Sequence, residues 1–228
     1  MKVLAFDTAT NLLSVALLSN NERFYFQLDC IQRQSERLME LSDAVCSSAR
    51  IKPNEINLVA CMRGPGSFTG LRIGMAAAKG LSSALNIPLI AIPTLDCLAY
   101  PHSHWPGLVL PLIDAKKSCF FTALYENGCR KSDYIDASSE EIIHLLQGTE
   151  PVLLTGVDAL MAEKALAPLL TSGRLRVDPA HRKGHAQELL SLALHRFETE
   201  AGGDAETLGP EYLRRSEAEL TRAEGKPL

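Results

Sequence analysis

The sequence predicts an α/β protein built from two similar lobes. Short apolar runs of strand length alternate with longer segments whose apolar residues recur at helical spacing. Aligning Asp7 with Asp114 superimposes, without a gap, two segments of the form apolar strand, Asp, short loop, apolar strand and turn. A stretch at 100–107 with prolines and a glycine separates them. We therefore expect an N-terminal lobe at 1–103, a C-terminal lobe at 104–216 that faces it across a cleft, and a charged, mobile tail at 217–228.

The first lobe is expected to begin with three strands, at 2–6, 12–18 and 24–28. A helix should follow at 35–50, because Leu38, Leu41 and Val45 recur at helical spacing. The remaining elements of this lobe are a strand at 56–62, a glycine-rich loop, a helix at 69–85 and a strand at 88–92.

The second lobe should start in the same way, with strands at 108–113 and 119–125 on either side of Asp114. Three helices are expected after them, at 140–146, 158–170 and 186–200. Gly202 and Gly203 follow the last helix and are suited to end it.

The composition excludes several classes of protein. A chain of 228 residues with 46% hydrophobic residues can bury a core, so bulk disorder is not expected. The formal net charge of -4 does not predict a broad basic face for nucleic acid. No apolar run approaches the ~20 residues that span a bilayer, and the N-terminus lacks a signal-peptide pattern. We expect a cytoplasmic protein that does not bind a membrane.

The largest group of candidate functional residues lies in the glycine-rich segment Arg63-Gly-Pro-Gly-Ser-Phe-Thr-Gly-Leu-Arg-Ile-Gly74. Gly64 and Gly66 permit backbone angles that a Cβ forbids, and Ser67 can cap the helix that follows. The free N–H groups at such a helix start favour an anion, although the pattern is not a Walker loop. Two interpretations stay open, a phosphate-binding loop and a tight turn into a closely packed helix.

The Asp that ends the first predicted strand is a second candidate for a residue that binds phosphate or a metal. Asp7 could coordinate a metal bound to phosphate, with the Thr8 hydroxyl as a donor, and Asp114 is its counterpart in the second lobe. The alternative, which we favour for an isolated Asp-Thr pair, is that both side chains organise the turn.

Small residues form a stripe on the helix at 69–85, at Gly70, Gly74 and Ala78. Each interior glycine costs ~1 kcal/mol relative to alanine, so another backbone should approach closely there. That backbone could belong to this chain or to another subunit. Because the helix at 35–50 carries more apolar surface than one core stripe needs, we expect a partner interface at Leu38, Leu41, Val45, Gly70, Gly74 and Ala78.

Two histidines, His181 and His185, have the four-residue spacing of a helical metal pair. Pro179 and Gly184 make helical geometry doubtful there, and His-Glu-x-x-His is absent. We expect surface histidines, and we predict neither catalytic residues nor metal ligands in this chain.

Taken together, these segments resemble the TsaB (YeaZ) family. The resemblance is carried by Leu4-Ala-Phe-Asp-Thr-Ala-Thr10, by the glycine-rich segment with Ala78-Lys-Gly-Leu81, by Leu112-Ile-Asp-Ala-Lys116 and by Pro210-Glu-Tyr-Leu-Arg214. It implies an actin-like fold of two duplicated lobes, shared with sugar kinases and heat-shock ATPases. It also implies a role in threonylcarbamoyladenosine modification of tRNA, beside a TsaD-like catalytic subunit that the N-terminal lobe binds and a TsaE-like ATPase.

The resemblance further implies that this chain is not the metal-bearing subunit. The catalytic paralogue carries two metal-binding histidines where this sequence has Thr94 and Leu98, and neither can replace an imidazole ligand. One departure is Gln34-Ser35, where the family usually has a histidine before the serine.

Three functions are therefore weighed. The first is a non-catalytic partner subunit that binds and activates a TsaD-like subunit, forms a homodimer when alone and contacts tRNA only indirectly. It has no intrinsic cofactor, and ATP or ADP would lie at the interface of the complex. The alternative is an independent nucleotide-binding ATPase or kinase-like enzyme, and a metalloprotease ranks last.

Overall fold

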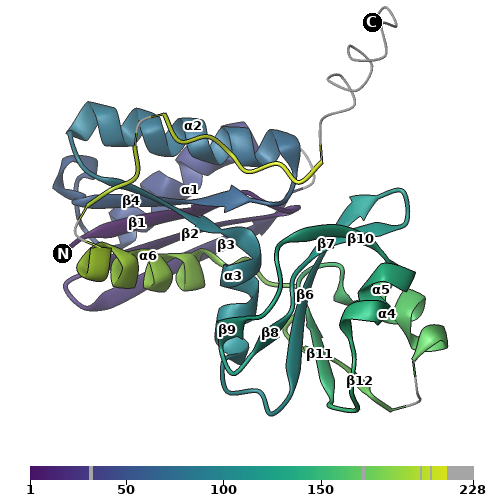
Figure 1. Cartoon of the computed structure of the whole chain (residues 1–228). Coiled ribbons are helices and arrows are strands. Elements are labelled where there is room, and N and C mark those ends of the chain that lie inside the picture. The colour runs from purple at the N-terminus through teal and green to yellow at the C-terminus, as the bar shows by residue number, and fades with distance from the viewer. Residues whose placement is uncertain (31–32, 171–172, 201, 206, 215–228) are drawn as a thin grey trace, which may run out of the picture.

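A computed structural model of the chain describes residues 1–30, 33–170, 173–200, 202–205 and 207–214. The tail predicted at 217–228 lies outside these residues. The described chain forms two β-sheets with helices packed on them (Figure 1). No helix within the described ranges is long and apolar enough to cross a membrane.

The first sheet has the strand order β3-β2-β1-β4-β5. The strands are β1 (Val3–Asp7), β2 (Leu12–Ser19), β3 (Glu22–Asp29), β4 (Leu58–Gly64) and β5 (Leu89–Pro93). The pairs β3–β2 and β2–β1 are antiparallel, whereas β1–β4 and β4–β5 are parallel.

Helices cover both faces of this sheet (Figure 1). α1 (Gln34–Ser48) and α2 (Phe68–Leu85) pack on the face that Leu4 and Phe6 of β1 point to. α6 (Ala186–Glu200) packs on the other face, against Val3 and Ala5. Alternate residues of β1 thus enter opposite cores, which explains why this strand is apolar throughout.

The second sheet has the order β10-β7-β6-β11-β12, and in addition β8 pairs with β6 and β9 pairs with β8. Its strands are β6 (Leu108–Lys116), β7 (Cys119–Thr122), β8 (Tyr125–Glu126), β9 (Cys129–Arg130), β10 (Ile135–Ser138), β11 (Val152–Thr155) and β12 (Leu175–Val177). α4 (Ser139–Leu145) and α5 (Ala159–Leu166) contribute to one core of this lobe, and α3 (Thr94–Ala99) contributes to another.

Five strands of the second sheet repeat the order and directions of the first sheet. β10-β7-β6 are antiparallel and β6-β11-β12 are parallel, as in the corresponding positions of the first sheet. β1, which ends at Asp7, corresponds to β6, which contains Asp114. The duplication inferred from the alignment of these two segments is therefore confirmed, as is the two-lobed α/β fold.

Some predicted boundaries differ from the structure. The helix expected at 158–170 ends as an α-helix at Leu166, and a 3-10 turn at Ala167–Leu169 follows with Pro168 in its first turn. α3 and the short strands β10, β11 and β12 were not predicted. α6 lies in the range assigned to the C-terminal lobe but packs on the first sheet. This helix therefore belongs structurally to the first lobe, which its position in the sequence does not reveal.

Candidate functional site

The two lobes meet at a cleft with a cavity of about 410 Å³. The first lobe contributes Gly66 and Ser67 at the start of α2, and the second lobe contributes Asp114 and the following loop. The segment at 211–214 forms a third part of the wall. The cavity lies within the size range of small-molecule sites in proteins, ~300–1,000 Å³.

The glycine-rich loop is shaped by contacts within the chain. Ser67 caps α2, since its hydroxyl accepts a hydrogen bond from the Gly70 amide at 3.2 Å. Its own amide donates to the Ala9 carbonyl at 2.7 Å, and a Cβ at Gly66 would lie 2.5 Å from the same oxygen. Gly64 has a φ of 124°, and a Cβ there would lie 2.3 Å from the Glu211 carbonyl. These contacts favour the tight-turn interpretation, although Gly66 and Ser67 do line the cleft.

Asp7 does not reach the cleft. It is 2% exposed, and its two carboxylate oxygens accept the backbone amides of Ala9 at 3.1 Å and His185 at 2.7 Å. Burial raises the pKa of this carboxyl above its ordinary value. The Thr8 hydroxyl is also buried and donates to the Gly70 carbonyl at 2.7 Å. Both side chains therefore organise the turn and join it to α2 and α6, as the alternative interpretation expected.

Asp114 does line the cleft, in a different environment from Asp7. One carboxylate oxygen accepts the Lys116 amide at 2.7 Å, and the other accepts the Lys116 ammonium at 2.5 Å. This hydrogen bond raises the pKa of Lys116. The Asp114 amide donates at 2.8 Å to Asp158, whose pKa is raised by burial. The Asp114 carboxylate is thus paired with a lysine two residues further along β6.

The predicted partner interface needs correction. Five of its six residues, all but Leu41, are buried in this chain: Leu38, Val45, Gly70, Gly74 and Ala78. A Cβ at Gly70 would lie 2.0 Å from the Thr8 carbonyl, and one at Gly74 would lie 2.3 Å from the Thr8 hydroxyl. The small-residue stripe therefore admits the turn after β1 of the same chain. A partner cannot contact these residues in the described state.

Three exposed apolar residues of the first lobe lie on α1 or on the neighbouring strand β3. Met39 of α1 is 45% exposed, and Phe26 and Leu28 of β3 are 39% and 36% exposed. β3 is an edge strand, and Phe26 stands opposite Val15, which points into the core under α1. Residues in register on antiparallel strands share a face, so Phe26 and Leu28 point to the α1 side of the sheet. Sequence reasoning missed them, although the aromatic alternation at 24–28 was the available signal.

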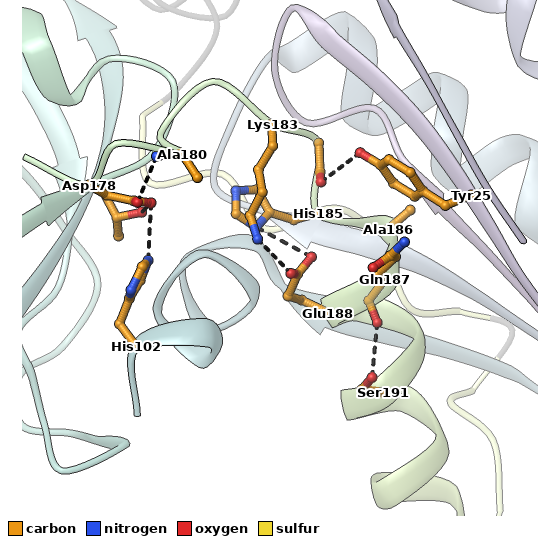
Figure 2. A network of polar contacts seen from close by, with 12 residues as sticks. Tyr25, His102, Asp178, Ala180, Lys183, His185, Ala186, Gln187, Glu188 and Ser191 are labelled. Carbon is orange, nitrogen blue, oxygen red and sulfur yellow. Dashed lines mark hydrogen bonds and ion pairs between the residues drawn. The ribbon is translucent and has the colours of Figure 1, made fainter. Parts of the chain in front are cut away.

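His185 lies in a charged cluster between the lobes, shown in Figure 2. It is only 3% exposed, so the prediction of a surface histidine is wrong for this residue. Its Nδ1 lies 3.6 Å from Glu188, which also pairs with Lys183 at 2.9 Å. Burial alone would raise the pKa of Glu188, but the polar contacts that its carboxylate makes with the His185 and Lys183 side chains outweigh burial and hold this pKa at about 2. The cause of the burial is α6, whose start enters between the lobes to reach Asp7.

A second histidine of this region is His102. It is partly buried, and its Nε2 lies 3.2 Å from Asp178 (Figure 2). Burial lowers the pKa of His102 below its ordinary value, although Asp178 acts in the opposite direction.

Thr94 and Leu98, which stand where the paralogue's metal ligands were expected, are both buried on α3. Within the described ranges, no group of three His, Cys, Asp or Glu side chains is placed to hold a metal ion.

Two sheets of the same strand order, facing a shared cleft, define a two-lobed α/β protein of the actin-like class. A family model described as TsaD, tRNA N6-adenosine threonylcarbamoyltransferase, matches residues 29–161. The chain belongs to the TsaB (YeaZ) family, a relationship that its curated relatives show.

Two of these relatives cover nearly the whole chain. A Bacillus subtilis protein is 30% identical over 226 residues, and an Escherichia coli protein is 32% identical over 232 residues, with 96% of both chains covered in each comparison. Both are named tRNA threonylcarbamoyladenosine biosynthesis protein TsaB. The solved structure of YeaZ from Pseudomonas aeruginosa is similar with a TM-score of 0.80 and 25% identity, covering 93% of this chain and 99% of that one.

Proposed function

We propose that this protein is a non-catalytic partner subunit that binds and activates a TsaD-like catalytic subunit in threonylcarbamoyladenosine modification of tRNA. A TsaE-like ATPase is the third component, and ATP or ADP would lie at the interface of the complex. Activation would be a shift of the catalytic subunit towards its active state, through contacts made only in that state.

The observation that carries the proposal is the set of contacts that the carboxylates of Asp7 and Asp114 make within this chain. Asp7 is buried with both oxygens accepting backbone amides, and Asp114 is paired with Lys116. A Mg²⁺ ion that bridges to phosphates needs carboxylate oxygens that are free to coordinate it. Asp7 is instead buried away from the cleft with both oxygens bonded, and Asp114 is paired with the exposed Lys116, which supports a binding role rather than phosphoryl chemistry.

The exposed apolar residues beside α1 are the proposed partner surface, consisting of Phe26, Leu28 and Met39 with the partly buried Leu41. Apolar side chains grouped at an edge strand and the neighbouring helix are typical of protein interfaces. The same surface would be covered in a homodimer when the chain is alone, because an isologous interface uses one patch twice.

The test is threonylcarbamoyl transfer to tRNA by the purified TsaD-like subunit, the TsaE-like ATPase and the activated donor, with and without this chain. We expect transfer to depend on the chain, and the chain alone to be inert. Equal transfer in both reactions would contradict the activating role.

The surface is tested separately with Phe26→Asp and Met39→Asp. A carboxylate buried in an apolar interface costs about 2 kcal/mol or more, so each variant should bind the catalytic subunit at least about 30-fold more weakly. Leu160→Asp is the matched control, because Leu160 is 47% exposed on α5 of the second lobe. If all three variants bind like the unmodified chain, the interface lies elsewhere.

The independent nucleotide-binding enzyme remains the second candidate because of the cleft. Ser67 at the start of α2 and the Lys116–Lys117 loop face the same cavity of about 410 Å³. Calorimetric titration of the chain with ATP and Mg²⁺, followed by a hydrolysis assay, distinguishes the two functions. Turnover of ATP by the chain alone would favour this candidate.

A further inference from the structure

The segment that follows α6 returns along the first lobe and ends on the second (Figure 1). Asp204 anchors its beginning to the edge strand β5. The Asp204 amide donates to the Leu89 carbonyl at 2.7 Å, and its carboxylate accepts the Ala91 amide at 2.7 Å. Arg196 of α6 holds the same carboxylate with two nitrogens, at 2.6 and 3.1 Å.

The middle of the segment is held against the end of β4 and the start of α2. The Glu211 amide donates to the Arg63 carbonyl at 2.8 Å. The Tyr212 ring packs on Phe68 with 4.7 Å between ring centroids, and its hydroxyl accepts a hydrogen bond from Arg72 at 3.0 Å. The absence of a side chain at Gly64 makes room for the Glu211 carbonyl.

The next two residues contact only the second lobe in the hydrogen bonds and core packing described. Leu213 packs into the core that contains Ile113 and Phe121. The Arg214 guanidinium bonds both carboxylate oxygens of Asp136 in β10, at 2.5 and 2.7 Å, and donates to the Ala115 carbonyl of β6 at 2.6 Å. The contacts therefore change from one lobe to the other between Tyr212 and Leu213.

This crossing also lines the cleft, since Glu211, Tyr212, Leu213 and Arg214 form part of the cavity wall. We propose that residues 210–214 form a clasp that holds the two lobes in one relative orientation and closes one side of the cleft, with the Arg214–Asp136 pair as its latch. Two-lobed proteins change shape by hinge motion, and a bidentate arginine–carboxylate pair is strongly directional. Rotation of the lobes must break either this pair or the contacts of Glu211 and Tyr212 with the first lobe, so the clasp opposes opening of the cleft. The inference does not depend on the proposed function.

The experiment measures the distance between the lobes in the full chain by pulsed electron spin resonance. Spin-labelled amino acids are encoded at Asp43 of α1 and Lys164 of α5, which are both exposed, so the native cysteines remain. The unmodified clasp should give one narrow distance distribution. Arg214→Ala and Asp136→Ala should each broaden it and shift its mean.

Amide hydrogen exchange provides the second measurement. The Glu211 amide, protected by the Arg63 carbonyl, should exchange at least about tenfold faster in both variants, because a released clasp exposes it to water. Restoring the ion pair in the opposite sense, with Arg214→Asp and Asp136→Arg together, should narrow the distance distribution again.

The control is Arg37→Ala, which removes an exposed arginine that pairs with Glu40 within α1. It should change neither measurement. If circular dichroism shows that the Arg214→Ala variant does not fold, Arg214→Lys replaces it. Lysine keeps the charge but cannot make the two-point contact with a carboxylate. Narrow distributions and unchanged Glu211 exchange in the folded Arg214 and Asp136 variants would overturn the proposal.

Discussion

Replacing Gly70 with alanine should destabilise this protein although alanine is the better helix former. The new Cβ would lie 2.0 Å from the Thr8 carbonyl oxygen, which is backbone and cannot rotate away. Moving α2 from the turn costs about 1–3 kcal/mol as in other overpacked cores. It also breaks the bond from the buried Thr8 hydroxyl to the Gly70 carbonyl, at a cost of about 1–3 kcal/mol.

The helix propensity of alanine offsets about 1 kcal/mol of this loss, which leaves a net destabilisation of about 3 kcal/mol. At ~2–4 °C per kcal/mol for a chain of this size, Tm should fall by about 6–12 °C. Urea unfolding followed by circular dichroism gives the free energy, and calorimetry gives Tm.

Gly80→Ala is the matched control, because Gly80 lies in the same helix and a Cβ added there would have nothing within 4 Å of it. It should raise the free energy of unfolding by up to about 1 kcal/mol. Equal stabilisation by both substitutions would refute the close approach of α2 to the turn after β1.

Two further predictions concern a helix cap and a buried carboxylate. Ser67→Ala should lower the free energy of unfolding by about 1 kcal/mol, because the hydrogen bond that caps α2 at the Gly70 amide is lost. Urea unfolding measures this free energy. An unchanged value would mean that water replaces the cap without cost. Glu188 has a folded pKa of about 2 against an ordinary 4.5, so its stabilisation is present above pH 4.5 and is lost as the pH falls towards 2. Glu188→Gln should therefore lower stability at pH 7 by up to about 3 kcal/mol and weaken its pH dependence between 4.5 and 2, as unfolding curves across this range would show. An unchanged pH dependence would contradict the pairing with Lys183 and His185.

Much of the fold could be predicted from the sequence because its signals are local. The apolar run before Asp7 and the similar run before Asp114 identified equivalent strands, and the sheets repeat the same order around them. Short strands such as β11 and β12 could not be predicted, since a run of three or four residues is too short to show a periodicity that separates a strand from a loop.

The candidate site was predictable only in part. Gly66, Ser67 and Asp114 do line the cleft, whereas Asp7, Thr8 and Gly64 do not. Asp7 and Asp114 occupy equivalent strands, but one is covered by α6 and the other is open to solvent on one side. Local sequence cannot distinguish them, because the covering helix comes from a distant part of the chain.

The sequence by itself determined the strand and helix periodicity, the duplication, the glycine positions that need a close backbone neighbour and the family. These properties depend on residues close together in the chain or on motifs read in order. Only the tertiary structure decided what lies against each face. The stripe at Gly70 and Gly74 meets Thr8 of the same chain, and His185 is buried because α6 packs on the first sheet. Periodicity shows that a helix face is covered, but the identity of the covering element depends on long-range packing.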